Sequence, residues 1–408
     1  MNKRFIIILT VFIDVLGIGI IIPVLPFYVE SFNTSALTVT LLFAIFSFFS
    51  FFSAPLLGAW SDKIGRRPVL ILSIMSTSLG WLIFAAAPSI LWLFIGRIID
   101  GLAAGNFPIA QSYLLDIAKN EKERTANLGV IGATFGVGLV IGPLIGGFLG
   151  NYYLSLPFWV IGFLALFNGL IAFFFLPESH LNKQPEKKTE LNPFRPIINA
   201  FRDKKLRLGL IAWFLFGLAV AADNSTFSLF IKAKFGFGSI IASFFLAGIG
   251  IILIFNQTVA LKKIWLKYFE EDKLNIVFLF LLSLGFLTVS LGGLWIFILG
   301  LLMVSITESI IRITTTSLTT RRAGKDKQGE VLGMMSSVMS LSMVIGPVLA
   351  GAIFLIDRRF PYMSAALFSF AAFVVMIIDR RHNKKTPKTL TVSEEEMAVE
   401  QQQINLAV

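Results

Sequence analysis

The sequence predicts an all-α membrane protein in which twelve transmembrane helices form two six-helix repeats. The 408 residues are 56% hydrophobic and only 14% charged, with a mean hydropathy of +0.81, which lies outside the range of soluble globular domains. Apolar runs of about 20 residues recur between polar breaks. Because the bilayer core offers no water to backbone polar groups, each run is expected to be a helix that satisfies its own hydrogen bonds.

The apolar runs place the individual helices and divide the chain into two bundles. In the first half we expect helices near residues 5–28, 39–60, 69–87, 90–115, 125–150 and 155–177, and in the second half near 207–231, 238–261, 274–292, 294–319, 329–356 and 360–379. The stretch between them, "PESHLNKQPEKKTELNPFRPIINAFRDKK", is charged, contains proline and is too polar to span. The domains predicted are an N-terminal bundle at 1–177, a cytoplasmic linker at 178–205, a C-terminal bundle at 206–382 and a mobile cytoplasmic tail at 383–408.

The distribution of basic residues predicts the orientation of the chain. With the N-terminus inside, only four of the 35 Lys and Arg residues fall in outer connections: Lys232, Lys234, Arg358 and Arg359. Basic residues concentrate on the cytoplasmic side of membrane proteins. Both termini are therefore expected in the cytoplasm, and the net charge of +11 is interpreted as a topology signal rather than as a nucleic-acid-binding face.

An internal repeat supports the division into two halves. A shift of 204 residues aligns "GVIGATFGVGLVIGPLIGG", which begins at Gly129, with "GMMSSVMSLSMVIGPVLAG", which begins at Gly333. Small residues and proline permit close helix contact and bending. The candidates for an interface of helices 5 and 11, across which the halves rock, are Gly142, Pro143, Gly146, Gly147, Gly346, Pro347 and Gly351; the alternative is packing alone.

Four stretches resemble the major facilitator superfamily, specifically its twelve-span drug:proton antiporters of the tetracycline-exporter-like and multidrug efflux branch. They are "DVLGIGIIIPVLP", "GAWSDKIGRRP", "GRIIDGLAAGN" and "GPLIGG". The resemblance implies the major facilitator fold, a bacterial cytoplasmic (inner) membrane location, antiport linked to antibiotic resistance, and a working monomer. The second half's counterpart of the helix 2–3 loop, "LKKIWLKYFEEDKL", keeps basic residues but lacks the Gly-Asp-Gly-Arg-Arg frame.

The same resemblance implies that the helix 2–3 loop is a conformational latch. Asp62 would contact the start of helix 11, Arg66 would contact Asp116, and breaking these contacts would accompany opening toward the cytoplasm. The latch residues are Gly58, Asp62, Gly65, Arg66, Arg67 and Asp116.

Charged residues within the predicted spans are the candidates for proton coupling. Asp14 lies in mid-span, where a charge costs about 2.5–3.5 kcal/mol on insertion scales and normally faces a cavity or a partner. Arg97 and Asp100 are three residues apart on helix 4, and Glu308 and Arg312 are four apart on helix 10. The resemblance implies a coupling role for Arg97. For each pair a static ion pair is the alternative.

Neutral polar side chains supply further candidates, and several classes of protein are excluded. Asn106, Gln111, Asn256 and Gln257 are candidates for lining a substrate cavity, with helix-to-helix hydrogen bonds as the alternative. Asp223, together with its neighbour Asn224, is expected near the outer end of helix 7 as an interfacial, solvated group. The chain has no Cys and two His, so we expect no metal site and no cofactor. It has no phosphate-binding loop or nucleophile elbow, which argues against ATP use and against an enzyme.

Three functional hypotheses follow. The first is a proton-coupled exporter of a small amphipathic compound that works by alternating access. The second is a symporter or exporter of a sugar, siderophore or other metabolite. The third is a transport-fold sensor or lipid-handling protein without ion coupling. The expected partners are a small-molecule substrate, protons and the lipid bilayer, and not nucleic acid.

Overall fold

A computed structural model of the protein describes residues 3–179, 205–323 and 328–385, together with residues 194, 198 and 201–203. Twelve helices in this part of the chain are long and apolar enough to cross a membrane, which confirms the predicted fold class. The helices of the first half are α1 (Lys3–Glu30), α2 (Ala36–Ile64), α3 (Arg66–Ala85), α4 (Ile90–Leu102), α5 (Asn106–Asp116), α6 (Glu121–Tyr152) and α7 (Leu156–Phe175). Those of the second half are α9 (Arg207–Phe235), α10 (Ser239–Phe255), the π-helix η1 (Asn256–Trp265), α11 (Leu266–Tyr268), α12 (Glu271–Leu291), α13 (Leu294–Ala323), α14 (Gln328–Phe354) and α15 (Phe360–Lys385).

The fourth span is interrupted, although a continuous helix over 90–115 was expected. It consists of α4 and α5, separated by a break over residues 103–105. Pro108 lies in the first turn of α5, where its missing N–H costs nothing, whereas inside a continuous helix it would remove a hydrogen bond to the preceding turn. The break makes Asn106 the first residue of a helix and thereby sets the direction of its side chain.

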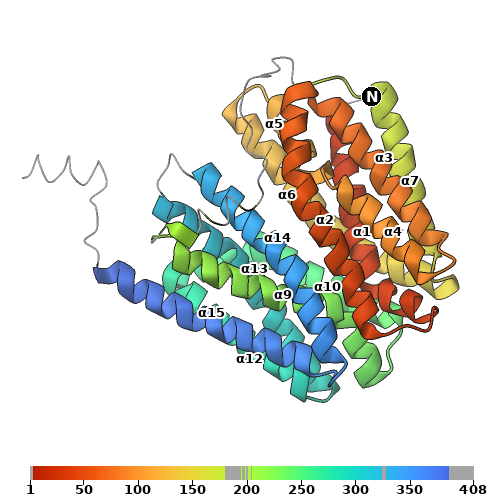
Figure 1. Cartoon of the computed structure of the whole chain (residues 1–408). Helices are drawn as coiled ribbons and strands as arrows, with labels where there is room; N and C mark the ends of the chain where they lie inside the picture. Colours follow the sequence, from red (N-terminus) through yellow and green to blue (C-terminus); the bar gives the residue numbers. More distant parts are fainter. Residues whose placement is uncertain are drawn as a thin grey trace, which may run out of the picture.

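The two halves form separate bundles that meet along two seams. Figure 1 shows one bundle built from α1–α7 and a second from α9–α15. The seams are α2 against α14 and α6 against α10. We call the end of the molecule that carries the start of α1 and the α2–α3 loop the basic face, because Lys63, Arg66 and Arg67 lie there. In Figure 1 the bundles diverge at the basic face and converge at the opposite face.

Contacts between the halves gather at the opposite face. A Cβ atom added to Gly147 would lie 3.1 Å from the carbonyl oxygen of Ser239 on α10, and one added to Gly351 would lie 3.1 Å from Leu37 on α2. Lys232 also forms an ion pair with Glu30, which joins the ends of α9 and α1. Gly147 and Gly351 are separated by the repeat shift of 204 residues, so the two seams are closed by equivalent positions.

The other small residues of the repeat pack within their own halves. A Cβ atom added to Gly142 would lie 2.9 Å from Gly19 on α1, and one added to Gly146 would lie 3.0 Å from Ile20. Gly346 faces Ala221 on α9 in the same way. Pro143 and Pro347 lie inside α6 and α14, respectively. The repeat therefore contributes bundle packing at most of its positions and contact between the halves at Gly147 and Gly351, while the rocking of the halves stays a prediction.

The predicted domain boundaries remain predictions. Most of the linker at 178–205 and nearly all of the tail at 383–408 fall outside the described residues. At the boundary between the first bundle and the linker, Pro177 accepts from Tyr113 on α5, and Glu178 accepts from the backbone N–H of Arg66 at the start of α3.

Candidate functional site

A cavity of about 1010 Å³ lies between the two halves, and the proton-coupling and substrate-cavity candidates of the first half line it. Its volume matches the upper range of pockets that hold drug-sized molecules. Gly58 near the end of α2 and Gly333 near the start of α14 both line it, and a Cβ atom added to either would meet nothing within 4 Å. The cavity therefore extends toward the basic face. Its wall is mainly apolar and aromatic, and the polar side chains in it are Asp14, Ser47, Ser50, Thr77, Arg97, Asp100, Asn106, Gln111, Asn224, Ser336, Ser337 and Ser340.

Asp14 is held by a short chain of hydrogen bonds. The Nδ2 atom of Asn106 donates to Asp14 Oδ1 at 2.7 Å and lies 3.0 Å from Thr77 Oγ1. Asn106 is buried, and its own Oδ1 has no hydrogen-bond partner among the described residues. The three residues come from α1, α5 and α3, so the break in the fourth span brings an amide donor to the carboxylate. Asp14 makes no ion pair in the described part of the chain, and a cation or a proton can compensate its charge.

Arg97 and Asp100 form a buried ion pair beside Asp14. Their Nη1 and Oδ2 atoms are 3.0 Å apart, and the residues are only 5% and 6% exposed. The guanidinium lies 4.3 Å from the ring centroid of Phe46 and 4.7 Å from that of Trp81, distances typical of cation–π contacts. The pair neutralises itself, which leaves Asp14 as the uncompensated charge of this wall.

The second half carries its own group of charged side chains near mid-membrane. Glu308 Oε1 and Arg312 Nη2 are 3.0 Å apart, one turn from each other on α13. The hydroxyl of Tyr362 on α15 donates to Asp223 Oδ1 on α9 at 2.9 Å. Asp223 lies midway along α9 rather than at an interfacial outer end, so that expectation was wrong: the helix continues as far as Phe235. None of Glu308, Arg312 and Asp223 lines the cavity described above.

The neutral candidates divide between the cavity and the helix contacts. Asn106 and Gln111 line the cavity, whereas Asn256 and Gln257 do not. Asn256 donates to the carbonyl oxygen of Ile306 at 2.8 Å and accepts from Trp265 Nε1 at 2.7 Å. Its amide nitrogen thus joins η1 to α13, and its amide oxygen accepts a bond within η1; the helix-to-helix hydrogen bond is the alternative that the sequence left open for this residue.

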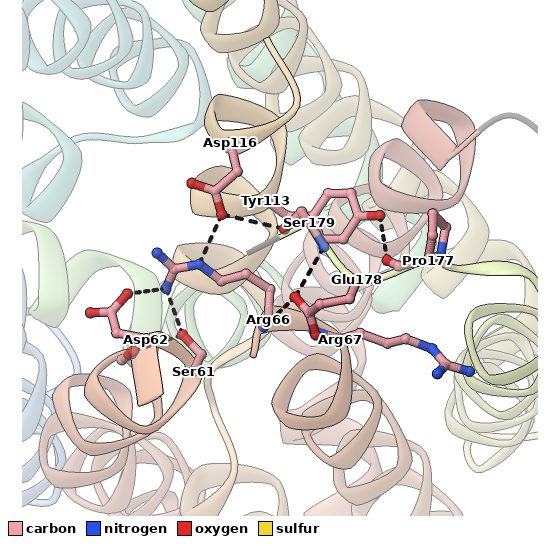
Figure 2. A network of polar contacts seen from close by, with 10 residues as sticks. Ser61, Asp62, Arg66, Arg67, Tyr113, Asp116, Pro177, Glu178 and Ser179 are labelled. Carbon is pink, nitrogen blue, oxygen red and sulfur yellow. Dashed lines mark hydrogen bonds and ion pairs between the residues drawn. The ribbon is translucent and has the colours of Figure 1, made fainter. Parts of the chain in front are cut away.

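The α2–α3 loop is the centre of a polar network at the basic face, and Figure 2 shows its members. Arg66 is central: its Nη1 lies 2.6 Å from Asp62 Oδ1, and its Nε lies 3.2 Å from Asp116 Oδ2. Gly65 has a φ of +115°, a conformation that side chains other than glycine rarely adopt, and this turn separates α2 from α3. We call Asp62, Arg66, Asp116 and Glu178 the N-terminal clamp.

Glu178 is a member of this network that the sequence did not single out. Its Oε1 accepts from the backbone N–H of Arg66 at 2.8 Å, and its Oε2 accepts from that of Arg67 at 3.2 Å. A carboxylate at a helix N-terminus accepts hydrogen bonds from backbone N–H groups that have no partner inside the helix. Its negative charge also interacts favourably with the positive end of the helix dipole. The hydroxyl of Tyr113 donates to the carbonyl oxygen of Pro177 at 2.7 Å. The end of the sixth span is thereby fixed to the second, third and fourth spans. An acid directly after a span, opposite a basic loop, is the signal that could have identified Glu178.

Comparison with known proteins settles the family. The sequence matches the Major Facilitator Superfamily over residues 7–268 and 264–401. The chain belongs to this superfamily. Among relatives, the tetracycline resistance protein of class E from Escherichia coli is 30% identical over 359 residues, which cover 86% of this chain and 87% of that protein. Multidrug resistance protein 2 from Bacillus subtilis (strain 168) is 28% identical over 381 residues, covering 91% and 92%. The quinolone resistance protein NorA from Staphylococcus aureus (strain MSSA476) is 28% identical over 395 residues, covering 94% and 98%.

Solved structures share the fold of the superfamily. The nucleoside transporter NupG superimposes with a TM-score of 0.74 at 14% identity, covering 93% of this chain and 99% of that chain. A bacterial homologue of the human lysosomal transporter Spinster, in an inward-facing and occupied conformation, gives a TM-score of 0.76 at 16% identity, covering 93% and 96%. At these identities the likeness concerns the fold alone.

One contact expected from the resemblance to the Major Facilitator Superfamily is not among the contacts of the described residues. Asp62 was expected against the start of helix 11, but among the described residues it pairs with Arg66, and its side chain is 53% exposed. Gly58 near the end of α2 and Gly333 near the start of α14 both line the cavity, which therefore lies between these helices toward the basic face. The Arg66–Asp116 contact is present although the cavity extends toward the basic face, whereas the resemblance implied that it breaks when that face opens.

Proposed function

We propose that the protein is a proton-coupled antiporter that exports a small amphipathic compound across the bacterial cytoplasmic membrane by alternating access. The observation that carries this proposal is the placement of Asp14, a carboxylate without an ion-pair partner in the described part of the chain, in a large apolar cavity between two bundles. Intramembrane acids of this kind mark substrate and proton pathways. The names of the relatives support export as the direction of transport and a drug-like substrate class, since these relatives are tetracycline, multidrug and quinolone resistance proteins.

The orientation follows from the charges of the loops. The basic face is placed in the cytoplasm, with both termini on that side, because basic residues concentrate there. The conformation described above is then open to the cytoplasm and closed to the outside by the Gly147 and Gly351 seams. A substrate enters the cavity from the cytoplasm or the inner leaflet. Bundles 1–177 and 206–382 then rock about it, so that the cavity opens outward.

Coupling arises from competition at Asp14. When the carboxylate is charged, it attracts a substrate that carries a cationic or hydrogen-bond-donating group, and Asn106 orients it by donation to Oδ1. A proton that arrives from outside neutralises the carboxylate and weakens its hold on the substrate, so the substrate is released. The neutral carboxyl then returns through the membrane at lower desolvation cost than a charged one. Asp100, Arg97, Glu308 and Arg312 are further coupling candidates, and Asp223 joins them because it too lies within a span, midway along α9.

The energy source, assembly and partners belong to the same proposal. A proton gradient drives transport without a cofactor, metal or ATP, and the chain works as a monomer without chemical catalysis or nucleic acid. Each bundle and the cavity between them lie within one chain, so the site needs no residue from a second copy.

The proposal is tested with purified protein in liposomes under an imposed pH gradient. Ethidium, tetracycline and norfloxacin serve as probes, and proton movement is followed by an internal pH dye. At least one probe is expected to move against protons, and an uncoupler should abolish its accumulation. Asp14→Asn should remove coupled movement, while Asn224→Ala, a change on the opposite wall of the cavity, leaves proton coupling in place. Accumulation by the natural chain without any probe-dependent proton flux would overturn the proposal.

A further inference from the structure

The second half carries a charged cluster at the basic face that no sequence motif predicted. It joins the start of α12, the end of α13 and the end of α15. We call it the C-terminal clamp, and its members are Glu270, Glu271, Asp272, Arg321, Arg322, Asp379 and Arg380.

The contacts of the C-terminal clamp run between helices rather than along one helix. Arg321 Nη1 lies 3.3 Å from Glu271 Oε2, which joins α13 to α12. Arg322 forms an ion pair with Asp379, which joins α13 to α15, and its Nη2 lies 3.9 Å from Asp272 Oδ1. These three helices lie together in the C-terminal bundle of Figure 1.

The C-terminal clamp corresponds to the N-terminal clamp with its charges reversed. Arg66 lies at the start of the third span of its half, and the residue 204 positions later, at the start of the ninth span, is Glu270. Asp116, at the end of the fourth span, has Arg321 as its counterpart within two positions of the same shift. Glu178, just after the sixth span, has Arg380 as its counterpart, again within two positions of the shift of 204 residues.

The contacts are reversed as well as the residues. In the first half, the Arg66 guanidinium at the start of the third span pairs with Asp116 at the end of the fourth, and Glu178 after the sixth span accepts from the backbone N–H of Arg66. In the second half, acids at the start of the ninth span meet bases at the ends of the tenth and twelfth: Arg321 with Glu271, and Arg380 Nη2 at 3.8 Å from Glu270 Oε2. The Gly-Asp-Gly-Arg-Arg frame is absent from the second half, but charges of opposite sign stand at or near the positions equivalent to Arg66, Asp116 and Glu178.

Burial distinguishes the core of this cluster from ordinary surface ion pairs. The Asp379 side chain is only 4% exposed and that of Arg322 is 17% exposed, whereas Arg321 is 62% exposed. Exposed pairs contribute little, but loss of one partner from a buried pair leaves a charge without compensation. Loss of one partner from the Arg322–Asp379 pair should therefore have the largest effect on the cluster.

We propose that the C-terminal clamp is a charge-reversed counterpart of the N-terminal clamp and holds α12, α13 and α15 together as one body while the halves rock. This inference rests on the proposed alternating-access transport. Turnover then depends on complementarity between Arg322 and Asp379, whereas substrate affinity does not, because neither residue lines the cavity.

The test compares single, double and reversed variants of the buried pair. Asp379→Asn and Arg322→Gln are each expected to lower ethidium turnover about tenfold at unchanged ethidium affinity. The double variant and the reversed pair, Asp379→Arg with Arg322→Asp, should recover most of this loss. Lys273→Gln is the matched control, since it removes a basic group that pairs with Glu270 only within the start of α12.

A second readout needs no transport. The chain has no Cys, so spin labels can be attached to cysteines introduced at Lys273 on α12 and Arg381 on α15. Pulsed-dipolar measurements should give one narrow distance for the natural pair, a broad distribution for Asp379→Asn, and a narrow one again for the reversed pair. Distances in the single variants that match the natural chain would identify the cluster as surface ion pairs only. Reversed variants as impaired as the single ones would also overturn the proposal. If the natural chain moved no ethidium, the transport proposal would fail, while the distance measurement would still decide on the clamp.

Discussion

Replacement of Arg97 by glutamine should destabilise the protein far more than replacement of the second intramembrane arginine, Arg312. Arg97 and Asp100 are 5% and 6% exposed with 3.0 Å between Nη1 and Oδ2, so Arg97→Gln leaves a buried carboxylate without its cation. Loss of one partner from such a pair costs about 3–5 kcal/mol. The contacts with the rings of Phe46 and Trp81 are lost as well, at about 0.5–2 kcal/mol each.

The free energy of unfolding, measured by titration of the purified protein with dodecyl sulfate, should therefore fall by at least about 3–5 kcal/mol in Arg97→Gln, and the lost ring contacts add to this figure. The double variant Arg97→Gln with Asp100→Asn removes both charges and should lose about half as much. Arg312→Gln is the matched control. Its side chain is 41% exposed, so the loss should not exceed about 1 kcal/mol. The reasoning is refuted if Arg97→Gln and Arg312→Gln destabilise equally, or if the double variant is less stable than Arg97→Gln.

Three further outcomes are expected. Gly351→Leu should disfavour closure of the opposite face and raise the accessibility of the cavity from that side. Gly129→Leu is the control and should have no such effect, because a Cβ atom at Gly129 meets nothing within 4 Å. The accessibility is measured by alkylation of a cysteine introduced into the cavity with an impermeant reagent. Glu178→Gln should weaken two hydrogen bonds at the start of α3 and lower the unfolding free energy by about 1–2 kcal/mol, a change that thermal unfolding against the natural chain would detect. The hydrogen bond from Arg359 lowers the pKa of Asp357 to about 2, so this group contributes stability above its unfolded pKa and loses it only as the pH falls toward 2. Asp357→Asn should therefore leave the pH profile of transport unchanged between about pH 5 and 8, and a shifted midpoint would count against the assignment.

The architecture could be predicted because it depends on strong, local signals. Apolar runs of membrane length between polar breaks predict the spans, and the repeat shift of 204 residues identifies equivalent positions of the two halves, such as Gly147 and Gly351. The polar residues of the fourth span were also identifiable, since Arg97, Asp100 and Asn106 are costly in lipid unless they have partners. Their partners in space, such as Asp14 for Asn106, come from helices far apart in sequence and required the structure.

The features that were missed depend on geometry that the sequence does not record. The break before Asn106 arises from a proline two positions later, a signal that is present but ambiguous in membrane helices. Asp223 was misplaced because the true length of α9 was not apparent from the polar residues around it. The C-terminal clamp was missed because charges of opposite sign stand at or near the equivalent positions of the repeat. The contact of Asp62 depends on which conformation the chain adopts, and one sequence encodes more than one.

The most direct test of the central claim is proton release on substrate binding. Ethidium is added to purified protein in weakly buffered detergent, and the pH change is recorded over a range of starting values from about pH 5 to 8. If substrate and proton compete at Asp14, the natural chain releases protons as ethidium binds, and Asp14→Asn binds ethidium with little or no release. Equal proton release by Asp14→Asn and the natural chain would contradict competition at this carboxylate.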